Sequence, residues 1–282
     1  MPAPLLPLAV AAFAAFAGVQ VARQSRDGAR ARAAWRELAA VAGPPVACFD
    51  PAMVAGLPEP ARRYFRFAIQ PGARLATVAE ITMEGELSLG TKQDPRYQPM
   101  QADQILAAPH GLVWRVRSGG GALRVAGSDG MVGTDSWTCF WLLGLVAVVR
   151  AGGNADHLRA AFGRVVAEAA IWSPAALLPR PGVAWSQPGA DTARVTLDHA
   201  GMRQDVDIRL DAAGQPLWVC MPRWSNANPD GVFRLQPFGG ELSDFRSVDG
   251  FRLPFRVEGG NFFGTPDYFP FYRARVLSLR LR

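Results

Sequence analysis

The chain has almost no lysine, and it has few residues of the kinds that hold metals. Lys92 is the only lysine among 30 basic residues, and cysteine and histidine occur three times each. Cys48, Cys139 and Cys220 lie far apart with no Cys-x-x-Cys spacing, which excludes a zinc ribbon or a thioredoxin-type motif. The three histidines are isolated in the sequence as well. We therefore expect neither a metal site nor a cofactor.

The sequence also lacks a cluster of positive charge. A formal net charge of +6 and a pI near 9.9 would suit nucleic acid or an anionic membrane. The arginines are scattered along the predicted strands and form no basic stripe, so we expect no nucleic-acid partner. Hydrophobic residues make up 49% of the chain, which is ample for a sizeable core.

Charge is absent altogether from Pro2 to Ala22. About 20 helical residues cover the roughly 30 Å hydrocarbon core of a bilayer, so residues 1–22 are predicted to be a transmembrane anchor. A cleaved signal peptide is the alternative, because residues 15–17 have the small-x-small form, yet no Lys or Arg precedes the apolar run. Arginines from Arg23 onward favour a single-pass protein of the inner (cytoplasmic) membrane with its domain on the cytoplasmic side. A periplasmic domain is the alternative.

The rest of the chain is predicted to form a juxtamembrane helix and linker over residues 23–57, and a single α+β domain over residues 58–282. A helix is expected over 58–69, followed by a long alternating strand over 75–89 and shorter strands over 100–107, 112–117 and 123–126. The apolar run 137–149 is interpreted as a buried helix. Residues 155–172 repeat apolar positions in steps of three and four, which predicts another helix, and strands are expected over 193–197, 202–210, 217–221, 251–257 and 274–281.

This order of strands, then helices, then strands predicts an α+β fold. We expect a strongly curved antiparallel β-sheet, half-barrel-like, packed on central helices and preceded by the N-terminal transmembrane helix. The crossover from Glu168 to Trp185 would connect the two runs of strands.

No recognisable catalytic constellation appears in the sequence. The segment 126–130 lacks the first glycine of a nucleophile elbow, and the glycines at 119–121 precede a strand instead of a helix. Glu168 borders the apolar stripe of its helix with Arg164 one turn earlier, so it either lines a pocket or forms a surface ion pair. The residues predicted to line an apolar ligand pocket are Trp114, Arg164, Glu168, Trp172, Trp185 and Trp218. The tryptophans are equally suited to fill the core.

The segment Phe262–Tyr272 is rich in aromatic residues. Six aromatic side chains in the twelve residues 261–272 are an unusual density for a connection between strands. It is predicted to be a pocket lip, a contact with a membrane or a membrane protein, or a cap on one end of the sheet.

Several segments together resemble the mostly bacterial family of uncharacterised proteins named DUF6544. The similar pieces run from about residue 58 to the C-terminus, and the most specific is Glu168–Pro179, with its Glu, Trp, Pro and Leu-Leu-Pro. Ser173 stands where we expect an aromatic residue. The resemblance implies no activity, but it is compatible with a half-barrel like that of outer-membrane lipoprotein carriers, whose concave face holds lipid.

These observations favour a membrane-anchored, non-enzymatic domain that binds an apolar ligand, such as a lipid or an acyl chain, between curved sheet and helices. The partner would then be membrane lipid. One alternative is an accessory subunit of a membrane protein complex, with the Phe262–Tyr272 segment as its interface. An enzyme built around Glu168 is a further alternative.

Overall fold

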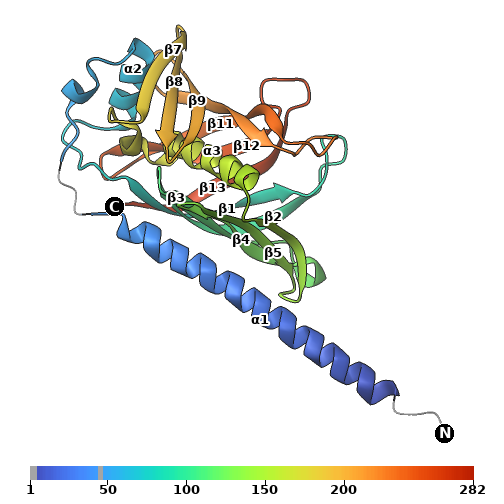
Figure 1. The fold of residues 1–282 in the computed structure, drawn as a ribbon. Helices are drawn as coiled ribbons and strands as arrows, with labels where there is room; N and C mark the ends of the chain where they lie inside the picture. The colour runs from blue at the N-terminus through green and yellow to red at the C-terminus, as the bar shows by residue number, and fades with distance from the viewer. Residues whose placement is uncertain (1–4, 44–46) are drawn as a thin grey trace.

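The computed structural model of the protein describes residues 5–43 and 47–282, without the side chains of residues 5–9, 13 and 122. The described residues contain thirteen strands, all in one antiparallel sheet (Figure 1). The strands are β1 (Val78–Ser88), β2 (Tyr97–Ala107), β3 (Gly111–Ser118), β4 (Val125–Val132), β5 (Asp135–Leu142), β6 (Val146–Gly152), β7 (Val183–Gly189), β8 (Thr192–His199), β9 (Met202–Leu210), β10 (Pro216–Ser225), β11 (Arg234–Val248), β12 (Phe251–Asn261) and β13 (Phe269–Leu281).

The sheet is built from two meanders that meet at its centre. Its strand order is β6-β5-β4-β3-β2-β1-β13-β12-β11-β10-β9-β8-β7, so the first strand pairs with the last. This central pairing runs from Ala79 opposite Leu281 to Leu87 opposite Tyr272. Because β13 closes against β1, the two halves of the chain form a single curved sheet, and the predicted antiparallel α+β fold is confirmed.

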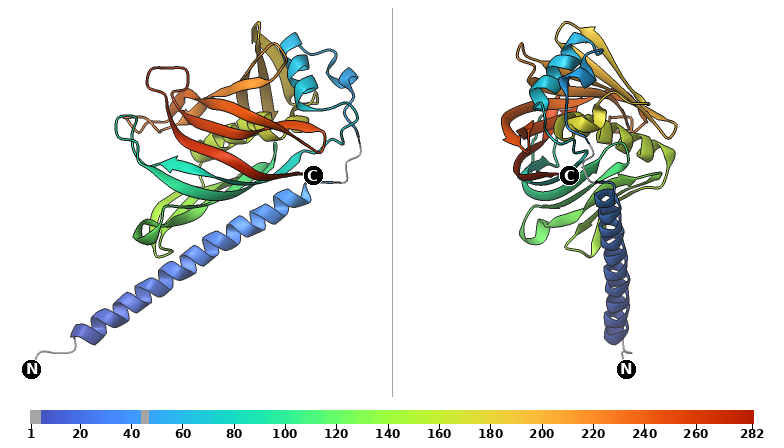
Figure 2. Two further views of the ribbon diagram at one scale, coloured as in Figure 1. Left: turned by 180° about the vertical axis from the view of Figure 1, so that it is seen from behind. Right: turned by 90° about the vertical axis from the view of Figure 1, so that its left-hand side faces the viewer.

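Helix α3 (Ala155–Trp172) lies across the inner face of the curved sheet (Figures 1 and 2). Its N-cap Asn154 accepts a hydrogen bond from the backbone N–H of His157 at 2.8 Å. The helix ends where Ser173 leaves helical geometry, and the short helix η3 (Pro174–Leu177) follows. All four residues of η3 are buried, so this crossover packs into the core between the two meanders.

The apolar run 137–149 is not a buried helix. It forms the hairpin of β5 and β6, with Cys139 opposite Arg150 and Leu142 opposite Val146. Leu143 and Gly144 both have positive φ angles, 52° and 73°, and turn the chain between the strands. An unbroken apolar run contains no period that separates strand from helix, which is why the prediction was wrong.

Helix α1 (Leu5–Ala40) is continuous across the predicted border between anchor and juxtamembrane segment at residue 22. Its C-terminal half packs on the outer face of the sheet, and its N-terminal half projects beyond the body (Figure 2). Among the described residues, no helix is long and apolar enough to cross a membrane. The predicted transmembrane anchor is therefore not confirmed, and residues 1–4 of it lie outside the described residues.

The predicted helix over 58–69 is confirmed as α2 (Glu59–Ala68), which follows the short helix η1 (Pro51–Val54) and covers one end of the half-barrel. The alternation along each strand then separates two apolar clusters. The larger cluster fills the space between sheet, α2 and α3, and includes Phe65, Ile81 and Phe162. The smaller one joins α1 to the outer face of the sheet, and contains Ala31, Ala34, Leu38, Val78, Ile105, Ala107, Val113, Trp137 and Cys139.

Candidate functional site

A polar cluster joins α3 to the inner face of the sheet. Nη1 of Arg164 lies 2.8 Å from Oδ2 of Asp129 on β4, and its Nε donates to Oε1 of Glu168 one turn along the helix. Gln104 on β2 donates to the other oxygen of Glu168 and accepts from Arg164 at 3.3 Å. The single guanidinium therefore connects helix α3 to two strands.

The charges of this cluster are largely removed from water. The side chains of Arg164 and Glu168 are 20% and 13% exposed, and Gln104 is fully buried. Burial by itself disfavours the charge on Arg164, but the carboxylates of Glu168 and Asp129 outweigh it and raise the pKa of the guanidinium above its ordinary value. Arg164 is therefore a fixed cation.

Glu168 lies between helix α3 and the inner face of the sheet. The pair of Arg164 and Glu168 is not a surface ion pair, because it faces the sheet and both carboxylate oxygens accept hydrogen bonds, one from buried Gln104 and one from the largely buried Arg164. A carboxylate that is held on both oxygens positions the helix on the sheet. A role of Glu168 in ligand binding stays a prediction.

Aromatic side chains surround the cation of this cluster. The guanidinium carbon of Arg164 lies 5.4 Å from the ring centroid of Trp114 on β3. Trp114 in turn packs edge-on against Tyr272 at 6.2 Å and Phe140 at 6.4 Å. Burial, followed by the charge of Glu168, raises the pKa of Tyr272 above its ordinary value, so the phenol stays neutral.

Two histidine contacts extend the cluster toward the N-terminus of α3. Nδ1 of His157 lies 2.9 Å from the hydroxyl of Ser136, and Nε2 lies 3.0 Å from the hydroxyl of Thr138. Thr138 donates to Asp129 at 3.0 Å. Burial, opposed in part by Asp129, lowers the pKa of His157. The ring is therefore neutral at pH 7.

A second arginine, Arg223 on β10, lies beside the cluster. Burial, with a further contribution from the charge of Arg164, lowers its pKa, while Asp129 opposes the shift. Its guanidinium carbon lies 4.7 Å from the ring centroid of Phe238, and its Nε is a buried donor without a partner among the described residues. The indole N–H of Trp114 is also buried without such a partner.

The other predicted site residues lie elsewhere. The indole of Trp172 is buried in the core and donates to the carbonyl of Pro254 at 3.1 Å. Trp185 packs on Phe65 of α2, with 5.1 Å between ring centroids. Trp218 packs at 5.5 Å against Phe263. Of the six, the structure therefore brings together Trp114, Arg164 and Glu168.

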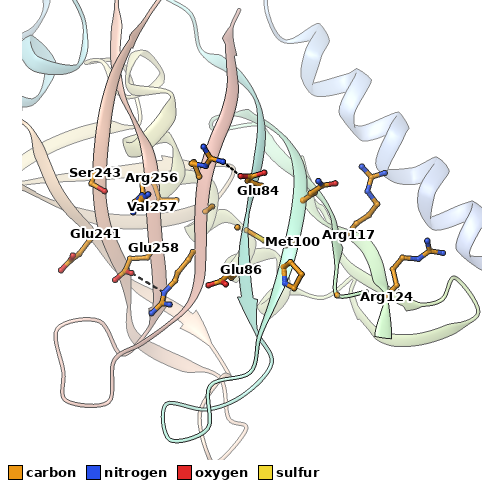
Figure 3. A pocket seen from close by; sticks show the side chains of 17 residues that line it. Glu84, Glu86, Met100, Arg117, Arg124, Glu241, Ser243, Arg256, Val257 and Glu258 are labelled. Atoms are coloured by element: carbon orange, nitrogen blue, oxygen red, sulfur yellow. Dashed lines mark hydrogen bonds and ion pairs between the residues drawn. The ribbon is translucent and has the colours of Figure 1, made fainter. Parts of the chain in front are cut away.

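The outer face of the sheet carries a charged hollow of about 980 Å³ (Figure 3). Glu84 and Glu86 of β1 line it beside Arg117 of β3, and ion pairs such as Glu258 with Arg273 cross it. Glu84 pairs with Arg275 and Glu258 with Arg273 across neighbouring strands, and further charged side chains line the hollow. The chemistry of this hollow does not fit an apolar ligand.

A second hollow, of about 820 Å³, fits one better, and we call it the aromatic hollow. It lies between three connections: the β1–β2 loop, the loop before β11, and the Phe262–Tyr272 segment. These connections gather at the end of the sheet away from α2 (Figures 1 and 2). The lining residues are Ser88, Leu89, Gly90, Thr91, Lys92, Gln93, Pro229, Arg234, Asn261, Phe262, Asp267, Phe269 and Phe271.

The walls and rim of the aromatic hollow differ in chemistry. Phe262, Phe269 and Phe271 are only partly buried, so they leave apolar surface within it. Two cations, Lys92 and Arg234, also line it. Inside, the side-chain oxygen of Asn261 is buried without a hydrogen-bond partner among the described residues. Such an acceptor is satisfied by a donor brought by a ligand or by water.

Aromatic rings connect this hollow with the polar cluster. The ring centroids of Phe271 and Phe238 lie 6.2 Å apart, and the ring of Phe238 packs under the guanidinium of Arg223. Sequence reasoning identified the aromatic segment but missed Gln104, Asp129, Arg223 and Asn261. Each of these is a single polar residue within a strand, and no local pattern distinguishes it from an exposed one.

Comparison with known proteins gives a family and a distant fold likeness. A LolA superfamily protein from Nitrosomonas europaea has a TM-score of 0.40 at 10% identity, covering 79% of this chain and 92% of its own. A domain from Vibrio parahaemolyticus, described as a putative outer membrane lipoprotein-sorting protein domain, has a TM-score of 0.35 at 10% identity. The similarity covers 73% of this chain and 85% of that domain. No curated protein matches the sequence.

A family model matches most of the chain. The family is described as a family of unknown function, DUF6544, and its model matches residues 47–274, which include every strand except the end of β13. Glu168–Pro179, the most specific of the segments that suggested this family, lies within the match. The chain belongs to the DUF6544 family.

Proposed function

We propose that this protein binds an apolar molecule, a lipid or an acyl chain, in the aromatic hollow, and that it does so as a binding protein at a membrane. The observation that carries the proposal is the aromatic hollow itself. Its volume of about 820 Å³ lies in the usual range for small-molecule sites, which are mostly apolar with a few convergent polar groups.

The space between the sheet and α3 is filled by side chains, so we place the ligand in the aromatic hollow instead. Sequence reasoning put it between curved sheet and helices, but side chains such as Val165 and Ala169 of α3 are fully buried there against the sheet. A packed core holds few voids larger than water. The aromatic hollow, in contrast, has partly exposed phenylalanines, so a ligand can occupy it without displacing the core.

The polar groups of the aromatic hollow specify the kind of ligand. Lys92 favours a molecule with an anionic head group beside its apolar chain, whereas Arg234 is already paired with Asp230 at 2.7 Å. The unpaired oxygen of Asn261 favours a hydrogen-bond donor, such as a hydroxyl or amide N–H, near the head group. A phospholipid or an acylated polar molecule combines these features.

Membrane association is the second part of the proposal, and it rests on α1. No charged side chain precedes Arg23, and Val10, Phe16, Val19 and Val21 of the projecting helix are each at least 48% exposed. Exposed apolar surface of this kind is favoured at a bilayer. The arginines that follow favour the cytoplasmic side of the membrane for the body.

Two phenylalanines of the same segment offer a matched test. Phe271 lines the aromatic hollow, whereas Phe263 packs against Trp218 and does not line it. Binding of a fluorescent fatty acid to the full chain should weaken by roughly tenfold in Phe271→Ser, since a buried aromatic contact is worth about 1–2 kcal/mol. Phe263→Ser should bind like the wild type. Equal binding by wild type and Phe271→Ser would contradict the proposal.

A further inference from the structure

The two edges of the sheet have opposite characters. Edge strand β7 carries Ser186, Gln187 and Pro188, which protect an edge from pairing. Edge strand β6 begins Val-Ala-Val-Val, and its first six residues are exposed on both faces. The edge at β6 is therefore apolar and unprotected, whereas the edge at β7 is protected. Exposed apolar surface of this kind indicates a contact with another surface.

The exposed apolar residues continue around the β5–β6 turn. The backbone N–H of Leu143 donates to the carbonyl of Arg124 at 2.9 Å, which brings Leu123 to the same end of the sheet. We call this surface the tip patch; its members, with their exposed fractions, are Leu123 (68%), Leu143 (47%), Leu145 (38%), Val146 (51%) and Val148 (47%).

The tip patch lies beside helix α1 near Gln24 and Asp27. A Cβ placed on Gly144 would be 3.9 Å from the side chain of Gln24. Asp27 fixes this arrangement, because one carboxylate oxygen accepts from Trp141 at 3.0 Å and the other from Arg150 at 3.1 Å. The hairpin therefore meets α1 where the uncharged stretch ends, and the helix N-terminal to this point rises about 30 Å.

Arginines surround the tip patch at that level. Arg23 and Arg26 on α1 are exposed, and so are Arg124 beside the hairpin and Arg150 on its strand β6. Asp27, the acidic group that faces them, is engaged by Trp141 and Arg150. An apolar surface with a basic surround matches the interface of an anionic bilayer, where acyl chains meet negative head groups.

We propose that the tip patch is a membrane-contact surface, which inserts into the head-group region of an anionic bilayer beside α1. The inference rests on the membrane placement of α1 in the proposed function, but it is independent of the aromatic hollow. A bilayer is favoured over a protein strand because β6 is apolar on both faces, whereas strand pairing covers only the hydrogen-bonding edge.

A polarity-sensitive fluorophore on an introduced cysteine tests the contact in the full chain. Leu145→Cys places the fluorophore in the tip patch, and Leu217→Cys places a control fluorophore on β10. The native side chains are similarly exposed, Leu145 at 38% and Leu217 at 40%. Both variants carry Cys48→Ser, because Cys48 is exposed. Cys139 is buried, and burial, with a smaller effect of Asp207, raises the pKa of Cys220 to about 11, so neither native thiol competes for the label at pH 7.

The chain is incorporated into vesicles of equal parts phosphatidylcholine and phosphatidylglycerol, and flotation measures its association. The expected result is a shift to shorter wavelength and quenching by brominated acyl chains at position 145, with neither at position 217. In vesicles of phosphatidylcholine alone, the shift at position 145 should be smaller, since the arginines then lack anionic partners.

Three results would overturn the inference. If the chain floats with vesicles while the label at 145 stays in water, the tip patch proposal fails and the membrane part of the proposed function stands. Failure to float removes both. A shift at 145 that needs no vesicles and grows with protein concentration shows that a second copy covers the patch through β6.

Discussion

Arg164 of α3 and Asp129 of β4 form an ion pair, 2.8 Å between Nη1 and Oδ2, across the interior of the half-barrel. With Glu168 on the same guanidinium, the pair attaches the central helix to the sheet, and Gln104 and the ring of Trp114 complete its contacts. The position of α3 on the sheet therefore depends on one charged residue in addition to apolar packing.

Removal of this cation should destabilise the fold strongly. Arg164→Met leaves the carboxylates of Asp129 and Glu168 largely buried without their partner. We expect a loss of about 3 kcal/mol in the free energy of unfolding, at the lower end of the range for buried pairs because the side chains keep some exposure. Chemical denaturation followed by circular dichroism measures this loss.

A surface ion pair of the same chain provides the control for Arg164→Met. Arg203 and Asp198 lie 3.0 Å apart with side chains 66% and 49% exposed. Arg203→Met should change the free energy of unfolding by less than about 0.5 kcal/mol. Equal effects of the two substitutions would show that the Arg164 cluster does not hold the helix.

The neutral His157 predicts how stability depends on pH. Burial, opposed by Asp129 and assisted by Arg223, lowers its pKa in the folded chain, whereas the unfolded chain keeps the ordinary value near 6.5. Between the two values the unfolded state binds more protons, so the free energy of unfolding falls as pH drops below about 6.5 and is constant above it for this group. Acid therefore weakens the contact of α3 with β5.

His157→Gln should reduce that acid sensitivity. Denaturation midpoints at several values between about pH 7.5 and about pH 5.5 provide the comparison. The variant should keep a smaller slope, because burial, followed by the charges of His199 and Arg180, also lowers the pKa of His110. A slope unchanged by His157→Gln would show that this histidine does not titrate as its environment predicts.

How much of this could be read in the sequence depends on the pattern of each segment. The alternation of β1 and the three-four spacing of α3 predicted both elements, because one face of each is buried. The run 137–149 was misassigned as a helix. One face of β5 packs under α1 and β6 is apolar on both faces, so apolar residues do not alternate with polar ones along the run. Strands β7 and β11 were missed as well, because β7 is an exposed edge and β11 alternates only in part.

The candidate site was foreseen less completely, for a physical reason. Arg164 and Glu168 are one helical turn apart, so sequence spacing predicted their contact. Asp129 and Gln104 reach them only because β2 and β4 curve around α3, and such convergence is a property of the whole sheet. The same holds for Asn261 at the end of β12 and Leu89 in the β1–β2 loop, which both line the aromatic hollow.

The docking of α1 can be tested through a buried thiol. Cys139 lies in the cluster that α1 covers, and Leu38 of α1 is fully buried in the same cluster. Leu38→Ala should cost about 3 kcal/mol of docking and so raise the rate of Cys139 modification by roughly a hundredfold. Mass spectrometry of the labelled chain measures that rate.

Glu37→Ala is the matched control for this docking, because Glu37 is exposed on the same helix. It should leave the modification rate of Cys139 unchanged. If Leu38→Ala has no effect either, the cover over Cys139 does not come from α1.

The aromatic hollow is the centre of the functional account, and native mass spectrometry of the full chain released from membranes tests it most directly. The wild-type protein should carry lipid or take up added phospholipid, Phe271→Ser should lose it, and Phe263→Ser should keep it. A wild-type protein that remains bare when phospholipid is supplied in excess would show that the aromatic hollow does not bind lipid.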